Sequence, residues 1–377
     1  MKSIIKFIIS TVVTLLIVLI LGTFLIGYFV NINQFKSELT KVVKQKTGRT
    51  LLIKSNMKLS YFPLSLRVQN VTLSRENKPN QIQFSIKKAT IKANLVKLME
   101  GKFVINKLSL TGTTLYLNNK NKIFIKQLNS RCIFRDNTLT LNPIQASLYN
   151  GALSGKLTLN LDNNKLKLNT NATKISIKPL LMDAANYKQL TGNINFNFNI
   201  ETSSKNPSTI TNQMNGSGAF SALNGKYYGV NPILLVKQTY AALKKKPMPA
   251  TPNKPATAFK SVTATFNIKN GVLSTNGFKV LGKGFSISAQ GNANLNNSTI
   301  DFEQKITIDR KHQEALEVPV NITGTLTKPQ FKPNMVYLAK ITLQTAGDAI
   351  IKNFHSSKEG LSDAGKKLSE AIGKIFK

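Results

Sequence analysis

The chain has 377 residues and a formal net charge of +36, from 52 Lys and Arg against 16 Asp and Glu. Such a charge is typical of proteins that contact nucleic acids or anionic membrane surfaces. Only six of the basic residues are Arg, the residue that makes most specific base contacts, so we expect no nucleic-acid partner. The Lys excess is then background composition or, alternatively, attraction to acidic membranes. The single Cys132 excludes an internal disulfide.

The first predicted element is an apolar helix that is long enough to cross a bilayer. Phe7 to Val30 form a run of 24 residues without charge, and about 20 are needed. The run is longer than a secretory h-region and lacks a small-residue cleavage site, so we predict an uncleaved anchor over residues 1–30. Lys2 and Lys6 precede it, which favours a cytoplasmic N-terminus and export of the remaining chain.

A short helix and then a series of strands are predicted after the anchor. Residues 31–50 place Leu39 and Val43 on one helical face, and Gly48 ends the helix. Beyond Ser55, apolar and polar residues alternate, which indicates strands with one dry and one wet side. Antiparallel sheets accommodate such strands. We therefore predict a mainly β region over residues 31–201.

The most regular strand runs from Asn193 to Ile200, with its apolar side chains on one face and asparagines on the other. An earlier strand with Leu157, Leu159 and Leu161 is expected to form a hairpin with the segment around Leu166 and Leu168, across the loop 162–165. These two strands supply the candidate residues of a hydrophobic groove: Ile194, Phe196, Phe198, Ile200, Leu157, Leu159 and Leu161. An open apolar trough is unfavourable in water unless acyl chains fill it, and the alternative is an ordinary filled core.

The second half of the chain is expected to continue the sheet. A polar stretch at 202–215 marks a boundary, and residues 202–335 form the second β region. Within it we predict a helix at 231–246 and an exposed Pro-rich loop at 247–257. Residues 336–377 predict an amphipathic helical tail that packs on the sheet or lies on a membrane or partner. Asn-Gly pairs at 150, 215, 224, 270 and 276 predict turns between strands.

Residues with catalytic or metal-binding potential are few. His312 and His355 are the only histidines, and their spacing does not suit a shared metal. Asp301 and Glu303 share one strand face, where such pairs are usually structural, and Cys132 has no CxxC partner. We therefore predict no catalytic, cofactor-binding or metal-binding residues and no enzyme activity.

Several segments resemble the AsmA family in order along the chain. They are residues 60–73 (from SYFPLSL), 98–112 (LMEGKFVINKLSLTG), 147–155 (SLYNGALSG), 216–225, 268–273 and 318–326. The resemblance covers roughly residues 1–335, although the chain looks shorter than typical members. It implies an N-terminal transmembrane helix in the inner membrane, followed by an elongated, curled antiparallel β-sheet groove with a few short helices in the periplasm. It also implies a role in outer-membrane biogenesis and no catalytic residues.

Three functions remain open on this basis. The first is a single-pass, inner-membrane-anchored protein that holds or transports phospholipid in its groove. The second is a structural or assembly factor that binds outer-membrane protein precursors through a sheet edge. The third is an exported hydrolase with an unrecognised site. The expected partners are membrane phospholipids, the inner membrane and, for the second function, outer-membrane assembly components.

Overall fold

The structure is a computed structural model that describes residues 32–333 with gaps, the longest at 204–209 and over most of 229–255. The anchor predicted for 1–30, most of the helix predicted for 231–246, most of the Pro-rich loop at 247–257 and the tail at 336–377 lie outside the described residues. Within these residues the protein is mainly β, with seventeen strands in an antiparallel sheet, which confirms the mainly β, antiparallel part of the predicted fold class. None of the described helices is long and apolar enough to cross a membrane.

The described chain forms two compact units. The first lies within Met1–Ser221 and also includes Asn267–Val272 and Leu295–Asn297. The second lies within Ala222–Phe266, Leu273–Asn294 and Ser298–Lys377.

The helices and complete strands for which the structure gives bounds in the first unit follow in chain order. They are α2 (Ile32–Thr47), β1 (Leu51–Ile53), β2 (Lys58–Tyr61), β3 (Leu64–Arg75), β4 (Lys78–Ala93), β5 (Phe103–Tyr116), β6 (Lys122–Arg135), β7 (Thr138–Leu148), β8 (Gly151–Asn160), β9 (Lys165–Ser176), α4 (Ile177–Ala185), β10 (Asn193–Ser203) and η1 (Ile210–Gln213). The strand β11 (Asn215–Tyr228) begins in this unit.

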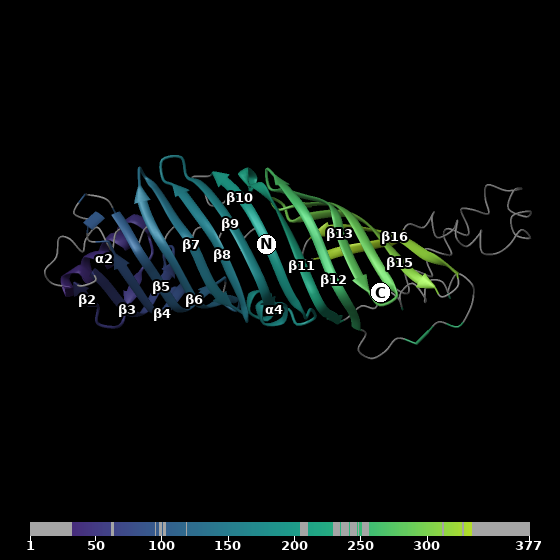
Figure 1. The fold of residues 1–377 in the computed structure, drawn as a ribbon, viewed down its shortest axis with the longest axis horizontal. Coiled ribbons are helices and arrows are strands. Elements are labelled where there is room, and N and C mark those ends of the chain that lie inside the picture. Colours follow the sequence, from purple (N-terminus) through teal and green to yellow (C-terminus); the bar gives the residue numbers. More distant parts are fainter. Residues whose placement is uncertain are drawn as a thin grey trace, which may run out of the picture. The chain divides into compact units, whose positions relative to one another are not determined.

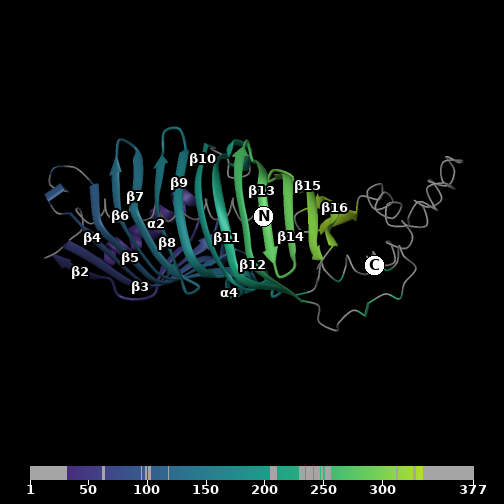
Figure 2. The ribbon, with the colours of Figure 1, turned by 45° about the vertical axis from the view of Figure 1, so that its right-hand side comes forward.

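Strands β2 to β10 form an antiparallel meander in which each strand pairs with the next one along the chain. Figures 1 and 2 show these strands side by side in sequence order. The short strand β1 pairs with β3, at the end of β3 that β2 leaves free. The predicted hairpin is confirmed, since Leu157 lies opposite Leu168 and Leu159 opposite Leu166. Residues opposite each other in such ladders point to the same face, so the register defines which side chains share a side.

The second unit contains the strands β12 (Ala256–Lys269), β13 (Val272–Gly282), β14 (Phe285–Asn294), β15 (Thr299–Arg310), β16 (Gln313–Thr325) and β17 (Lys328–Pro333), of which β12 and β13 have their connecting ends in the first unit. Strands β14 to β17 continue as an antiparallel meander. A small core lies on one face of it, where Ile287, Ile306 and Val318 follow one another across three strands.

Two of the five Asn-Gly pairs form the predicted turns. Asn150 and Asn270 have φ angles of 64° and 50° at the tips of hairpins. The prediction was wrong for the pairs at 215 and 224, which lie inside β11, and for the pair at 276, inside β13. Asn224 keeps a positive φ of 50° within its strand, because asparagine tolerates the left-handed conformation at a local irregularity as well as in a turn.

Candidate functional site

One face of the first unit carries continuous apolar rows that cross the strands. The longest row runs over eight strands from β10 to β3 and consists of Phe196, Ala172, Leu153, Ala146, Leu128, Leu110, Ala89 and Val68. A second row runs through Ile200, Leu168, Leu157, Leu141, Cys132 and Ile105. We call this side of the sheet the apolar face. The apolar face therefore joins both groups of predicted groove residues, on β8 and β10, to the N-terminal strands on a single surface.

The sequence-predicted groove residues are mostly brought together on this face. Phe196 and Phe198 stack with ring centroids 4.7 Å apart, and both side chains are half-buried. Leu157 and Leu159 are buried, at 5% and 4% exposure. Leu161 is different, because it lies in the turn after β8 and is 36% exposed.

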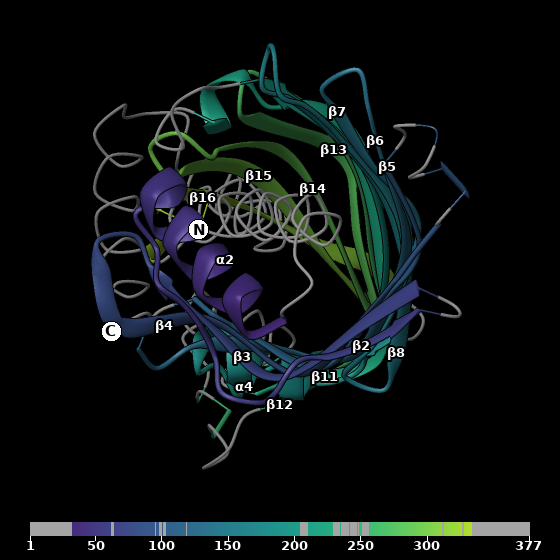
Figure 3. The same ribbon diagram turned by 90° about the vertical axis from the view of Figure 1, so that its left-hand side faces the viewer.

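Helix α2 covers the apolar face over the first strands (Figure 3). Its residues Leu39 and Val43 are 5% and 0% exposed and belong to the same hydrophobic cluster as the inward side chains of β1, β3, β4 and β5. A cavity of about 70 Å³ remains between them, lined only by apolar residues, among them Leu39, Ile53 and Leu110. This end of the apolar face is therefore a closed core.

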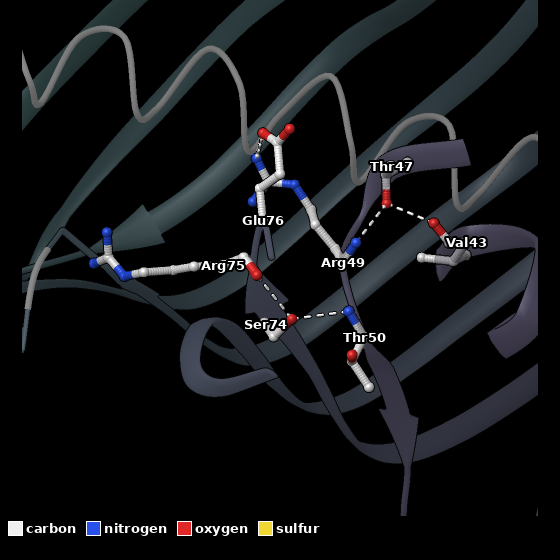
Figure 4. A network of polar contacts seen from close by, with 7 residues as sticks. All are labelled: Val43, Thr47, Arg49, Thr50, Ser74, Arg75 and Glu76. Carbon is white, nitrogen blue, oxygen red and sulfur yellow. Dashed lines mark hydrogen bonds and ion pairs between the residues drawn. The ribbon is translucent and has the colours of Figure 1, made fainter. Parts of the chain in front are cut away.

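A polar network fixes the end of α2 to the sheet (Figure 4). Thr47 Oγ1 donates to the Val43 carbonyl at 2.6 Å and accepts from the Arg49 N–H at 3.3 Å. The next residue, Thr50, donates its N–H to Ser74 Oγ at 2.8 Å, and its carbonyl accepts from the Ser74 N–H. Burial lowers the pKa of the Arg49 guanidinium, an effect that Glu76, 3.9 Å away, opposes. The chain leaving α2 is thus tied to the β3–β4 turn, which holds the helix over the first strands.

The other end of the apolar face is less enclosed. Along the longest row, Val68, Ala89 and Leu110 are buried, whereas Leu128, Ala146, Leu153 and Phe196 are only half-buried. The small Ala172, between Leu153 and Phe196, is the exception and is buried. On β10 all four predicted residues are half-buried, in contrast to the asparagines at 193, 197 and 199, which are exposed on the opposite side. An apolar surface of this extent that is only partly enclosed is suited to bind an apolar ligand.

Helix α4 borders this less enclosed part and contacts β6 and β9. It begins with the buried Ile177, and its Ala184 packs against the core cluster. The hydroxyl of Tyr149 donates to Asp183 Oδ2 on α4 at 3.0 Å and accepts from the Phe124 N–H of β6 at 2.9 Å. Burial raises the pKa of Tyr149 to about 12, so the phenol is neutral at physiological pH and serves as a bridge between α4 and the sheet.

Groups with chemical reactivity are sparse in the described part of the chain. Cys132 lies on the second apolar row with 0% exposure, and burial raises the pKa of its thiol to about 12, which leaves little nucleophilic thiolate. No group of three or more His, Cys, Asp or Glu that could hold a metal occurs among the described residues. Both histidines, His312 and His355, lie outside them.

Some residues of the apolar face were not singled out from the sequence. They include Leu128, Ala146, Leu153 and Ala172, which join the predicted strand β10 to the core under α2. Each stands in an alternating strand, but only the register shows that they share a row with Phe196. The helix α4 was also missed, although Pro179 in its first turn and the left-handed Asn186 at its end are recognisable signals.

Comparison with known proteins supports one assignment. A search of the curated proteins and of the solved structures finds no match. The sequence profile of the AsmA family matches residues 1–122 and 117–278, which together cover more than half of the chain. These two regions include helix α2 and every strand that contributes to the apolar face. The chain therefore belongs to the AsmA family.

Proposed function

We propose that this protein is anchored in the inner membrane, faces the periplasm, and holds or transports phospholipid along its apolar face in support of outer-membrane biogenesis. Membership of the AsmA family supports an envelope function related to lipids or the outer membrane. The uncharged run from Phe7 to Val30 supports the anchor. Together they support a location of the β units in the periplasm, where a lipid carrier would act.

The observation that carries the proposal is the change in burial along the longest apolar row. A row of eight apolar or small residues crosses the sheet without a charged side chain. It starts in the closed core at Val68 and Leu110 and ends at the half-buried Phe196. Acyl chains would remove the remaining apolar area from water, a gain of about 25 cal/mol per Å².

Site-specific photo-crosslinking tests this proposal directly. A crosslinker at Phe196 or Ile200 should capture phospholipid in cells, because both positions lie on the apolar face. A crosslinker at Asn197 or Asn199 is the matched control, since these exposed neighbours lie on the opposite face of the same strand. Capture of lipid at all four positions, or at none, would count against the proposal.

Two further outcomes separate the alternatives. Capture of outer-membrane protein precursors in place of lipid would favour the assembly factor. Alkaline phosphatase fused after Lys377 should be active if the chain is exported as the N-terminal charges predict. An inactive fusion would contradict the proposed periplasmic location. It would not bear on the ligand of the apolar face, which the crosslinking experiment identifies.

A further inference from the structure

The face opposite the apolar face is basic over the first strands. Strands β3 to β8 contain no Asp or Glu at all. Exposed cations project from β2 to β6 on this side, next in sequence to buried apolar residues such as Leu66, Ile91 and Leu108. We call the following residues the basic face: Lys58, Arg67, Lys88, Lys92, Lys107 and Arg131.

Some of these cations lie directly opposite one another in the ladder. Lys58 is the register partner of Arg67, and Lys92 is the partner of Lys107. Arg131 lies on the next strand, β6, where the register between β5 and β6 shifts at Lys107. Like charges directly opposite in a sheet are destabilising. A general excess of lysine does not require such pairs, because the register partners could be any of the many Asn, Ser or Thr residues of this sheet.

Some strand cations elsewhere in the chain are paired with carboxylates. On the last strands of the first unit, Glu201 lies 3.4 Å from Lys165 and 3.8 Å from its register partner Lys167. In the second unit, Lys305 pairs with Glu317 at 3.0 Å. Among the residues that the structure describes, the six members of the basic face form no ion pair with a carboxylate. Their charges are thus available to an external anion.

We propose that the basic face docks on the phosphate headgroups of an anionic membrane surface. The cations are spread over five adjacent strands rather than gathered in a pocket, which suits a layer of phosphates better than one small anion. The two opposed pairs and Arg131 contribute one cation to each strand from β2 to β6. Neighbouring strands of a sheet are about 4.8 Å apart, which sets the spacing of these cations across the sheet. Lysine-rich surfaces bind anionic lipid through many weak, salt-sensitive contacts. The docking surface is distinct from the apolar face, on the other side of the same strands.

Vesicle binding by the full-length chain tests the proposal. The protein is reconstituted in phosphatidylcholine nanodiscs, which accommodate any membrane anchor, and then mixed with vesicles of phosphatidylcholine with or without phosphatidylglycerol. We expect association only with the phosphatidylglycerol vesicles and a strong decrease on addition of salt. Combining Lys92→Glu, Lys107→Glu and Arg131→Glu should reduce this association at least about tenfold. The proposal would be overturned if the wild-type chain did not bind the phosphatidylglycerol vesicles.

Two further triple variants serve as controls. Combining Lys260→Glu, Lys269→Glu and Lys279→Glu changes the net charge equally at exposed positions of β12 and β13, and should leave binding nearly intact. An equal loss there would assign the binding to net charge and overturn the docking surface.

The neutral set Lys92→Gln, Lys107→Gln and Arg131→Gln removes the repulsion between opposed like charges, so it should fold at least as well as the native chain yet still lose binding. Native affinity in that set would refute the proposal, whereas lipid capture at Phe196, on the other face, should remain unchanged in it.

Discussion

The two ends of the apolar face use the same residue types in the same register but differ in what lies over them. At β3 to β5, helix α2 covers the row, and Leu110 is 2% exposed. At β10, Phe196 occupies the same row and is half-buried. Periodicity thus determines which side of a strand is apolar, whereas a separate covering element determines whether that side becomes a closed core or stays partly exposed. Four substitutions test this contrast.

The largest effect is expected for Leu110→Asp. A carboxylate at this position would be desolvated and unpaired beneath α2, which should lower the free energy of unfolding by more than about 4 kcal/mol. Chemical denaturation of the detergent-solubilised chain and its abundance in cells measure the loss. A stable Leu110→Asp protein would show that water reaches the covered end as well.

Removing the cover itself is the second test. Leu39→Ala deletes a 5% exposed side chain that lines the cavity under α2, and should cost about 2–4 kcal/mol. Leu52→Ala is the matched control, because this leucine is 48% exposed on β1 and its truncation should cost about 0.5 kcal/mol or less. Equal effects in urea unfolding would mean that α2 contributes little to the core.

Phe196→Asp is the counterpart of Leu110→Asp on the same row. The half-buried site keeps the new carboxylate partly hydrated, so the loss of unfolding free energy should be about 1–2 kcal/mol, chiefly from lost packing against Phe198. Lipid recovered with the purified protein should fall sharply in the same variant. A loss of stability as large as for Leu110→Asp would erase the distinction between the two ends.

The smallest effect concerns the border helix α4. Tyr149→Phe removes the hydroxyl that joins Asp183 to the Phe124 N–H, and should cost about 1 kcal/mol of unfolding free energy, seen as faster amide exchange in α4.

The same tyrosine predicts a pH dependence of stability. Because burial raises the pKa of Tyr149 to about 12, the unfolded chain loses this proton at a lower pH than the folded chain does. The stabilisation is thus complete below the unfolded pKa of about 10 and is lost as the pH rises toward 12. Tyr149→Phe should flatten that alkaline decline, to which Cys132 adds in the same direction; an unchanged pH profile would contradict the assignment.

Much of the fold follows from local patterns. Strict alternation defines β10, and the leucines of β8 and β9 define their hairpin together with its register. Helix α2 follows from its amphipathic spacing and from Gly48, whose φ is 66°. These features depend on neighbouring residues along the chain, which is why sequence reasoning reaches them.

The difference in burial along the apolar face is not accessible in the same way. It depends on the docking of α2 through Arg49, Thr50 and Ser74, contacts that join residues more than twenty positions apart. The alternation around Leu110 and around Phe196 looks alike in the sequence, although one side chain is buried and the other is not. Leu161 illustrates the limit at an element boundary, since one further step along the alternation takes it out of β8 and into the turn.

The meander from β2 to β10 also has a consequence for the order in which the protein can form. Each strand finds its hydrogen-bonding partner in the segment made just before it, so no strand has to wait for a distant part of the chain. Contacts of short sequence separation favour rapid folding. A chain that emerges N-terminus first, from a ribosome or a translocation channel, can therefore add one hairpin arm at a time to a growing edge that α2 has already anchored, and the newest strand alone stays exposed to unwanted pairing.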